Sequence, residues 1–83
     1  MPLYLDVHRE VEGLSPQMVA DAHVKDLAAQ GRYGVRYLKY WYDSASGKVF
    51  CLVEAPTAEA AIAVHREAHG MLPDEIFEVE EGG

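Results

Sequence analysis

Cysteine and basic residues are scarce in this sequence, and long apolar runs are missing. The 83 residues include one cysteine, Cys51, so neither an intrachain disulfide nor a site built from several thiolates can form. Seven lysines and arginines face 14 acidic residues, giving a formal charge of -7. This balance argues against nucleic acid and anionic membranes as partners, because phosphate groups are bound by basic surfaces. No apolar stretch approaches the length that spans a bilayer, so the sequence predicts a small acidic protein compatible with cation binding.

The first residues also lack the features of a secretory signal. The segment Met1–Asp6 has neither a basic start nor an apolar core, so we expect a cytoplasmic protein. The length allows a single domain over residues 1–83, with only a modest core. Because pairing with a second copy would bury more surface, we also expect a homodimer.

Residue patterns predict six elements in the order β-α-β-β-α-β. Ser15 and Pro16 are typical of a helix start, and Gly31 is expected to end that helix. Thr57 is expected to cap a second helix, which Gly70 ends. The expected strands cover residues 3–8, 35–42, 48–54 and 75–79, and the expected helices cover residues 16–30 and 58–69. This order predicts a ferredoxin-like α+β fold, in which a four-stranded antiparallel sheet carries both helices on one face.

The four histidines raise the question of whether they converge. His65 and His69 are four residues apart on the second expected helix, so they lie on the same face. That face also carries Ala61, so the apolar stripe that packs on the sheet continues into histidines. The stripe on the first expected helix continues in the same way into His23 and Asp26. Polar residues on the inner faces of both helices break the usual amphipathic pattern, as functional sites often do.

The predicted topology brings several of these side chains to one end of the domain. The end of the first strand, with an aspartate and a histidine, lies near the start of the first helix and the end of the second. Asp74 falls at the same end, whereas Glu54 falls toward the opposite end and ranks lower. The candidate metal ligands are therefore Asp6, His8, His23, Asp26, His65 and His69.

Histidine and carboxylate ligands suit nickel, zinc, copper or iron. A set without thiolate fits a six-coordinate nickel or cobalt ion better than a structural zinc site, which usually recruits cysteine. Clustered carboxylates also repel one another unless a cation offsets their charge. We therefore predict binding of a divalent transition metal, nickel first and zinc, cobalt or copper as alternatives, for storage, buffering or sensing. Asp26 could alternatively orient the imidazole of His23 instead of binding the ion.

Other interpretations remain open at this point. A histidine pair spaced by four residues often reflects packing, and Cys51 is interpreted as a small buried core residue. The runner-up function is a small dimeric enzyme of monooxygenase or isomerase type, with His23 as general base and Asp26 as its orienter. An apolar cleft large enough for an organic substrate would favour that function. A third hypothesis is an interaction module that uses the aromatic residues of the second strand, such as Tyr40 and Trp41.

Six short segments follow one another over nearly the whole chain: Asp6–His8, Ala22–Asp26, Gly47–Leu52, Glu54–Pro56, Val64–Gly70 and Asp74–Ile76. Together they resemble a small bacterial family, first described as a domain of unknown function, whose characterised branch binds nickel. The resemblance implies a dimer of ferredoxin-like protomers and nickel bound by histidine and acidic side chains. One departure is visible, because in the nickel-binding branch the second histidine of the pair is often shifted slightly and followed by proline, whereas Gly70 follows His69 here.

Overall fold

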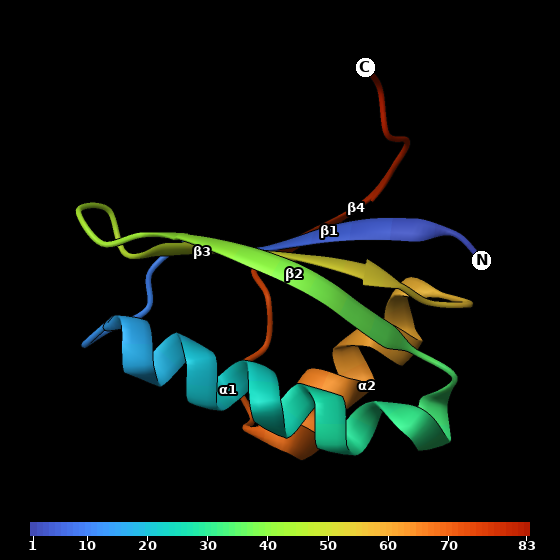
Figure 1. The fold of residues 1–83 in the computed structure, drawn as a ribbon, viewed down its shortest axis with the longest axis horizontal. Helices are drawn as coiled ribbons and strands as arrows, with labels where there is room; N and C mark the ends of the chain where they lie inside the picture. The colour runs from blue at the N-terminus through green and yellow to red at the C-terminus, as the bar shows by residue number, and fades with distance from the viewer.

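Four strands form one antiparallel sheet, and two helices cover one of its faces, in a computed structural model that describes all 83 residues (Figure 1). In space the strands follow the order β2-β3-β1-β4, so β1 and β3 are central. This arrangement confirms the predicted ferredoxin-like fold. The elements are β1 (Leu3–His8), α1 (Pro16–Ala29), the 3₁₀ turn η1 (Gln30–Tyr33), β2 (Arg36–Asp43), β3 (Lys48–Glu54), α2 (Ala58–Ala68) and β4 (Glu75–Val79).

Both helices begin where the capping residues predict. The Ser15 hydroxyl accepts a hydrogen bond from the Met18 amide, and the Thr57 hydroxyl accepts one from the Ala60 amide, each at 3.1 Å. These bonds satisfy amides that have no partner inside the helix. At the other end of α2, Gly70 adopts a left-handed φ of 77° and ends the helix as predicted.

The first helix does not end at Gly31, contrary to the sequence-based expectation. The chain leaves α1 at Ala29 and continues through η1 to Gly34, which has a φ of 66° and caps the turn. Gly31 keeps a negative φ, so only Gly34 supplies the left-handed conformation that ends a helix. The extra turn moves the start of β2 from the expected residue 35 to Arg36.

The register of the sheet decides which side chains face the helices. Asp6 on β1 lies opposite Cys51 on β3 and Ile76 on β4. Opposite residues of an antiparallel pair project from the same face, and so do residues two apart along one strand. Asp6, His8 and Cys51 therefore share the face that α1 and α2 cover.

The core fills the space between this face and the helices. Val53, Ala61 and Val64 are fully buried there. Four aspartate and histidine side chains are buried in the same layer: Asp6, His8, Asp26 and His65. Such residues are rarely buried unless they are paired, so their grouping marks the place to look for function. Neither helix has the length and apolar character needed to cross a membrane.

Candidate metal centre

His65 lies at the centre of a buried chain of histidine and aspartate side chains. Its Nε2 is 2.9 Å from Asp6 Oδ2, and its Nδ1 is 2.9 Å from Asp26 Oδ1. At most 3% of any of these three residues is exposed. Because carboxylates only accept hydrogen bonds, both ring nitrogens of His65 must donate, which makes the ring an imidazolium. α2 thus holds one cation between a carboxylate of β1 and a carboxylate of α1.

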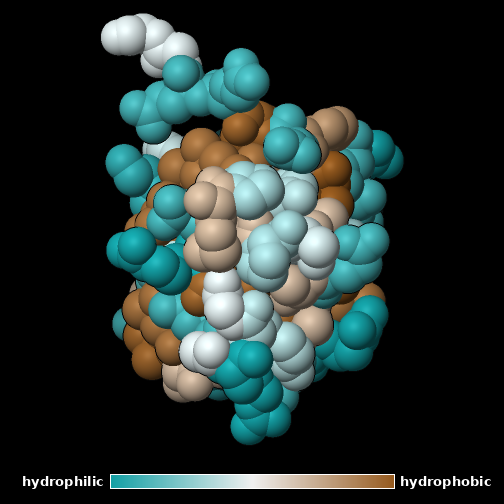
Figure 2. Space-filling view, turned by 90° about the vertical axis from the view of Figure 1, so that its right-hand side faces the viewer, coloured by the Kyte–Doolittle hydropathy of each residue, from teal (hydrophilic) through white to brown (hydrophobic).

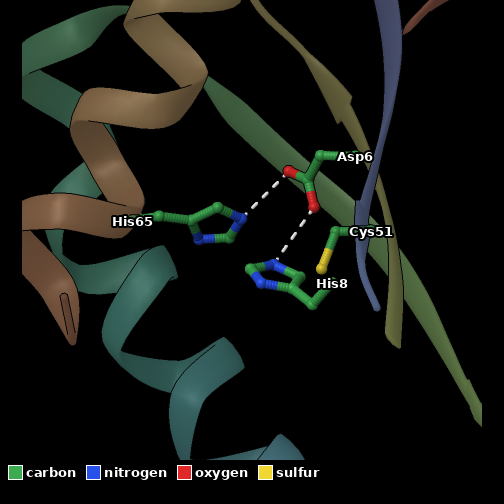
Figure 3. Close-up of side chains that lie close together, drawn as sticks. All are labelled: Asp6, His8, Cys51 and His65. Carbon is green, nitrogen blue, oxygen red and sulfur yellow. Dashed lines mark hydrogen bonds and ion pairs between the residues drawn. The ribbon is translucent and has the colours of Figure 1, made fainter. Parts of the chain in front are cut away.

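Asp6, His8, Cys51 and His65 form a group whose ligand atoms all lie within 4.8 Å of one another. Figure 3 shows His65 approaching from α2 while the other three side chains come from the sheet. His8 Nε2 is 3.3 Å from Asp6 Oδ1, but this oxygen is buried and accepts no hydrogen bond from the protein. A buried oxygen without a donor costs free energy, so Asp6 Oδ1 stands out as a position for a cation.

A second group, Asp26, His65 and His69, shares the central histidine. The Met71 amide donates to His69 Nδ1 at 3.1 Å, so the proton of this ring sits on Nε2. His69 Nε2 can then donate to Asp26 Oδ1 across 3.0 Å. Asp26 Oδ1 can therefore accept two N–H hydrogen bonds, one from His65 on α2 and one from His69, the residue that caps the C-terminal end of α2. In this arrangement His69 orients the Asp26 carboxylate, and the Asp26 carboxylate orients the His65 ring.

Burial and hydrogen bonding move the pKa values of the cluster far from their ordinary values. Burial alone would raise the pKa of Asp6, but the hydrogen bond from His65 and the neighbouring His8 ring outweigh it and hold the pKa at about 2. Burial alone would lower the pKa of His65, but hydrogen bonds to Asp26 and Asp6 raise it to about 11. Burial raises the pKa of the Cys51 thiol to about 11. At neutral pH the metal-free cluster therefore contains carboxylates, an imidazolium and a protonated thiol.

Acid is expected to destabilise the metal-free protein by about 2 kcal/mol through Asp6 alone. The pKa of this group falls from its ordinary 3.8 to about 2 on folding. Its contribution is therefore present above pH 3.8 and is lost as the pH falls through about 2. Urea unfolding at pH values between about 5 and 2 measures this loss. An Asp6→Asn variant should lack this part of the pH dependence, and an unchanged profile in that variant would contradict the assignment.

Five of the six predicted ligands lie in the buried cluster, and His23 lies apart from it. The His23 ring packs on Tyr40 with 4.9 Å between ring centroids, and it makes no hydrogen bond or ion pair within the chain. Asp26 contacts His65 and His69 instead of His23. The general-base pair of the enzyme hypothesis is therefore not formed.

Cys51 was interpreted as a core residue from the sequence, and it is buried, but it also belongs to the first group of candidate ligands. The alternation of β3 indicates burial, whereas the contact with Asp6 depends on the register of two strands. The two lower-ranked carboxylates lie outside the cluster. Asp74 accepts a hydrogen bond from the Arg9 amide at 2.7 Å, and Glu54 is 3.5 Å from Arg36.

Comparisons with known proteins cover nearly the whole chain. The family described as "Nickel responsive protein SCO4226-like" matches residues 4–79, a range that includes every residue of the buried cluster. Among solved structures, the crystal structure of SCO4226 from Streptomyces coelicolor A3(2) is similar over 98% of this chain and 99% of that chain. The two share 40% sequence identity, with a TM-score of 0.90. No curated protein matches the chain.

Proposed function

Because this chain belongs to the SCO4226-like family of nickel-responsive proteins, we propose that it binds one nickel ion in the buried cluster. The proposed ligand atoms are Asp6 Oδ1, His8 Nε2, Cys51 Sγ and His65 Nε2. The observation that carries the proposal is Asp6 Oδ1, a fully buried carboxylate oxygen without a hydrogen-bond donor among three other ligand-type side chains. The ion would be stored, buffered or sensed.

A divalent ion can replace two protons at this position without changing the net charge of the cluster. Without metal, the buried carboxylates of Asp6 and Asp26 face one imidazolium, which leaves one negative charge uncompensated. When an ion binds, His65 and Cys51 lose the protons that occupy their ligand atoms. A divalent ion replaces the two positive charges that leave with these protons, so the cluster keeps the same net charge, and the neutral His65 still donates to Asp26.

Asp26 and His69 are better placed to form hydrogen bonds that orient the metal ligands than to coordinate the ion themselves. A histidine that binds a metal usually donates its other N–H to a carboxylate, which fixes the ring and raises its basicity. Asp26 is placed to accept that bond from His65 Nδ1. His69 Nδ1 accepts from the Met71 amide, so His69 Nε2 carries a proton and is not free to bind an ion while that bond is kept.

The ligand chemistry is compatible with several ions, and nickel is proposed because the matching family is described as nickel-responsive. Imidazole suits zinc, copper, iron and nickel, and a thiolate adds a soft ligand that zinc and copper also accept. Zinc, cobalt and copper are therefore tested beside nickel. A smaller affinity for nickel than for zinc would leave the site as proposed but change the ion.

Calorimetric titration of chelator-treated protein with nickel tests the proposal, because it measures both the heat of binding and the number of protons released. We expect one nickel ion per chain and the release of two protons, from His65 and Cys51, whose pKa values both stand at about 11. The apparent affinity should then rise about a hundredfold per pH unit between about pH 6 and 8. Titration in two buffers of different ionisation enthalpy counts the protons directly. No binding of any of the four ions, or binding without proton release, would contradict the proposal.

The uncovered face of the sheet supports the predicted homodimer. Leu5 lies opposite Leu52 and Phe77, and Trp41 lies opposite Phe50, so these side chains share the face that carries no helix (Figure 1). Trp41 is 49% exposed and Phe77 is 48% exposed. Seen from the side, hydrophobic surface lies at the level of the sheet below the C-terminal segment (Figure 2). We propose that a second copy of the chain covers this apolar face.

A charge on this face is expected to separate the dimer. Trp41→Glu would bury a carboxylate in the interface without a partner, so the dimer should dissociate to monomers at micromolar concentration. Val24→Glu is the matched control, because Val24 is 63% exposed on α1, on the other side of the sheet. Light scattering after size-exclusion chromatography gives the mass of each variant. A monomeric parent protein, or equal masses for both variants, would overturn this part of the proposal.

A further inference from the structure

A cavity of about 40 Å³ lies against the buried cluster. One side of it is lined by three proposed ligands, His8, Cys51 and His65. Four more polar side chains contribute to its wall: His23, Asp26, Tyr40 and His69. The remaining wall is mostly apolar and comes from α1, the sheet and the segment after α2. Its apolar side chains are Val11, Met18, Val19, Ala22, Val49 and Met71.

The size of the cavity limits what it can hold. A water molecule needs roughly 10–15 Å³ by the same kind of measure, and a cavity of about 150 Å³ holds benzene. The observed volume lies between these two, so it fits a molecule of about two to four heavy atoms. The apolar part of the wall offers water no hydrogen-bond partner, whereas an apolar group of a ligand would fill it with contacts.

His23 and Tyr40 are the polar side chains of the cavity wall that remain free to bind a ligand. Both side chains line the cavity, they pack against each other, and neither side chain has a hydrogen-bond partner within the chain. A mostly apolar cavity with a few convergent polar groups is the usual form of a small-molecule site. The carboxylate of Asp26, which also lines the cavity, disfavours an anion, and the apolar wall disfavours any charged ligand.

We propose that this cavity binds a small neutral organic molecule that carries one hydrogen-bonding group. The polar group contacts His23 or Tyr40, and the apolar part contacts the side chains of α1 that face the cavity. Three of the four proposed nickel ligands line the same space, so a bound molecule lies next to the ion. The cavity exists in the metal-free chain, so the proposal does not depend on the identity of the ion.

Nuclear magnetic resonance of methyl-labelled, metal-free protein tests the proposal with ethanol as the probe. Ethanol has an apolar body and one hydroxyl, and its size matches the cavity. We expect saturable shifts in the millimolar range at the methyl groups of Met18, Ala22, Val49 and Met71, and none with benzene at the same concentrations. Shifts that rise linearly without saturation, or that spread evenly over exposed methyl groups, would overturn the proposal.

Filling the cavity should remove the binding. Ala22→Leu places three more carbons in the space and is expected to weaken ethanol binding at least tenfold. Ala28→Leu makes the same change on the exposed side of α1 and should leave binding unchanged. If Ala22→Leu fails to fold, Ala22→Val provides a smaller filling with a smaller loss of affinity. Unchanged binding in a folded Ala22 variant would refute the proposal, and because no metal is present, this result stands apart from any failure to bind nickel.

Discussion

Replacing Asp6 with asparagine is expected to abolish tight nickel binding and to lower the free energy of unfolding by about 3–5 kcal/mol. The substitution keeps the shape of the side chain but removes the charge that faces His65 and His8. His65 would remain buried with only Asp26 to compensate its positive charge. Urea unfolding of the metal-free variant and calorimetric titration with nickel measure the two effects.

Asp21→Asn is the matched control for this substitution. Asp21 lies on the exposed side of α1 and accepts one hydrogen bond, from the Gln17 amide group at 2.8 Å. Its replacement should change the free energy of unfolding by less than about 0.5 kcal/mol and leave nickel binding unchanged. If Asp6→Asn binds nickel as tightly as the control does, Asp6 Oδ1 is not a ligand.

Replacing His65 with glutamine should have the second largest effect, while the same change at His23 should have little. His65→Gln removes a proposed ligand and leaves the carboxylates of Asp6 and Asp26 buried without a cation between them. The pKa values of both carboxylates should rise, and nickel affinity should fall by more than about 100-fold, beyond the loss typical for residues behind the ligands. Nickel titration and carboxylate chemical shifts followed against pH measure these changes.

The His23→Gln variant tests whether His23, which the sequence predicted as a ligand, belongs to the metal site. His23 is half-buried and makes no hydrogen bond within the chain, so its loss should leave nickel affinity within about threefold of the parent. Equal losses in the two variants would restore His23 as a ligand. Retained affinity in His65→Gln would move the metal away from the buried cluster.

Most of the fold could be predicted because its signals are local. Alternation and β-branched residues defined β1, β3 and β4 at the residues where the structure has them, and hydroxyl caps defined both helix starts. The end of the first helix could not be predicted in the same way. Gly31 and Gly34 are both suitable helix ends by residue type, and only the backbone conformation of the folded chain selects Gly34.

The site shows the same division between local and long-range information. Helical periodicity placed His65 and His69 on the inner face of α2, and the topology brought them to Asp6. Periodicity also placed His23 with Asp26, but positions three apart differ by roughly 60° around a helix, enough to turn His23 away from the cluster. Cys51 joins the cluster through the pairing of β1 with β3, a register that no short pattern in the sequence specifies.

Anomalous diffraction at the nickel absorption edge, from crystals of the nickel-loaded protein, tests the central claim most directly. We expect one strong anomalous peak per chain inside the buried cluster, within coordination distance of Asp6 Oδ1, His8 Nε2, Cys51 Sγ and His65 Nε2. Asp26 should remain hydrogen-bonded to His65 Nδ1 and make no contact with the ion. A peak held only by exposed side chains, with the His65 imidazolium still clamped between its two carboxylates, would contradict this claim.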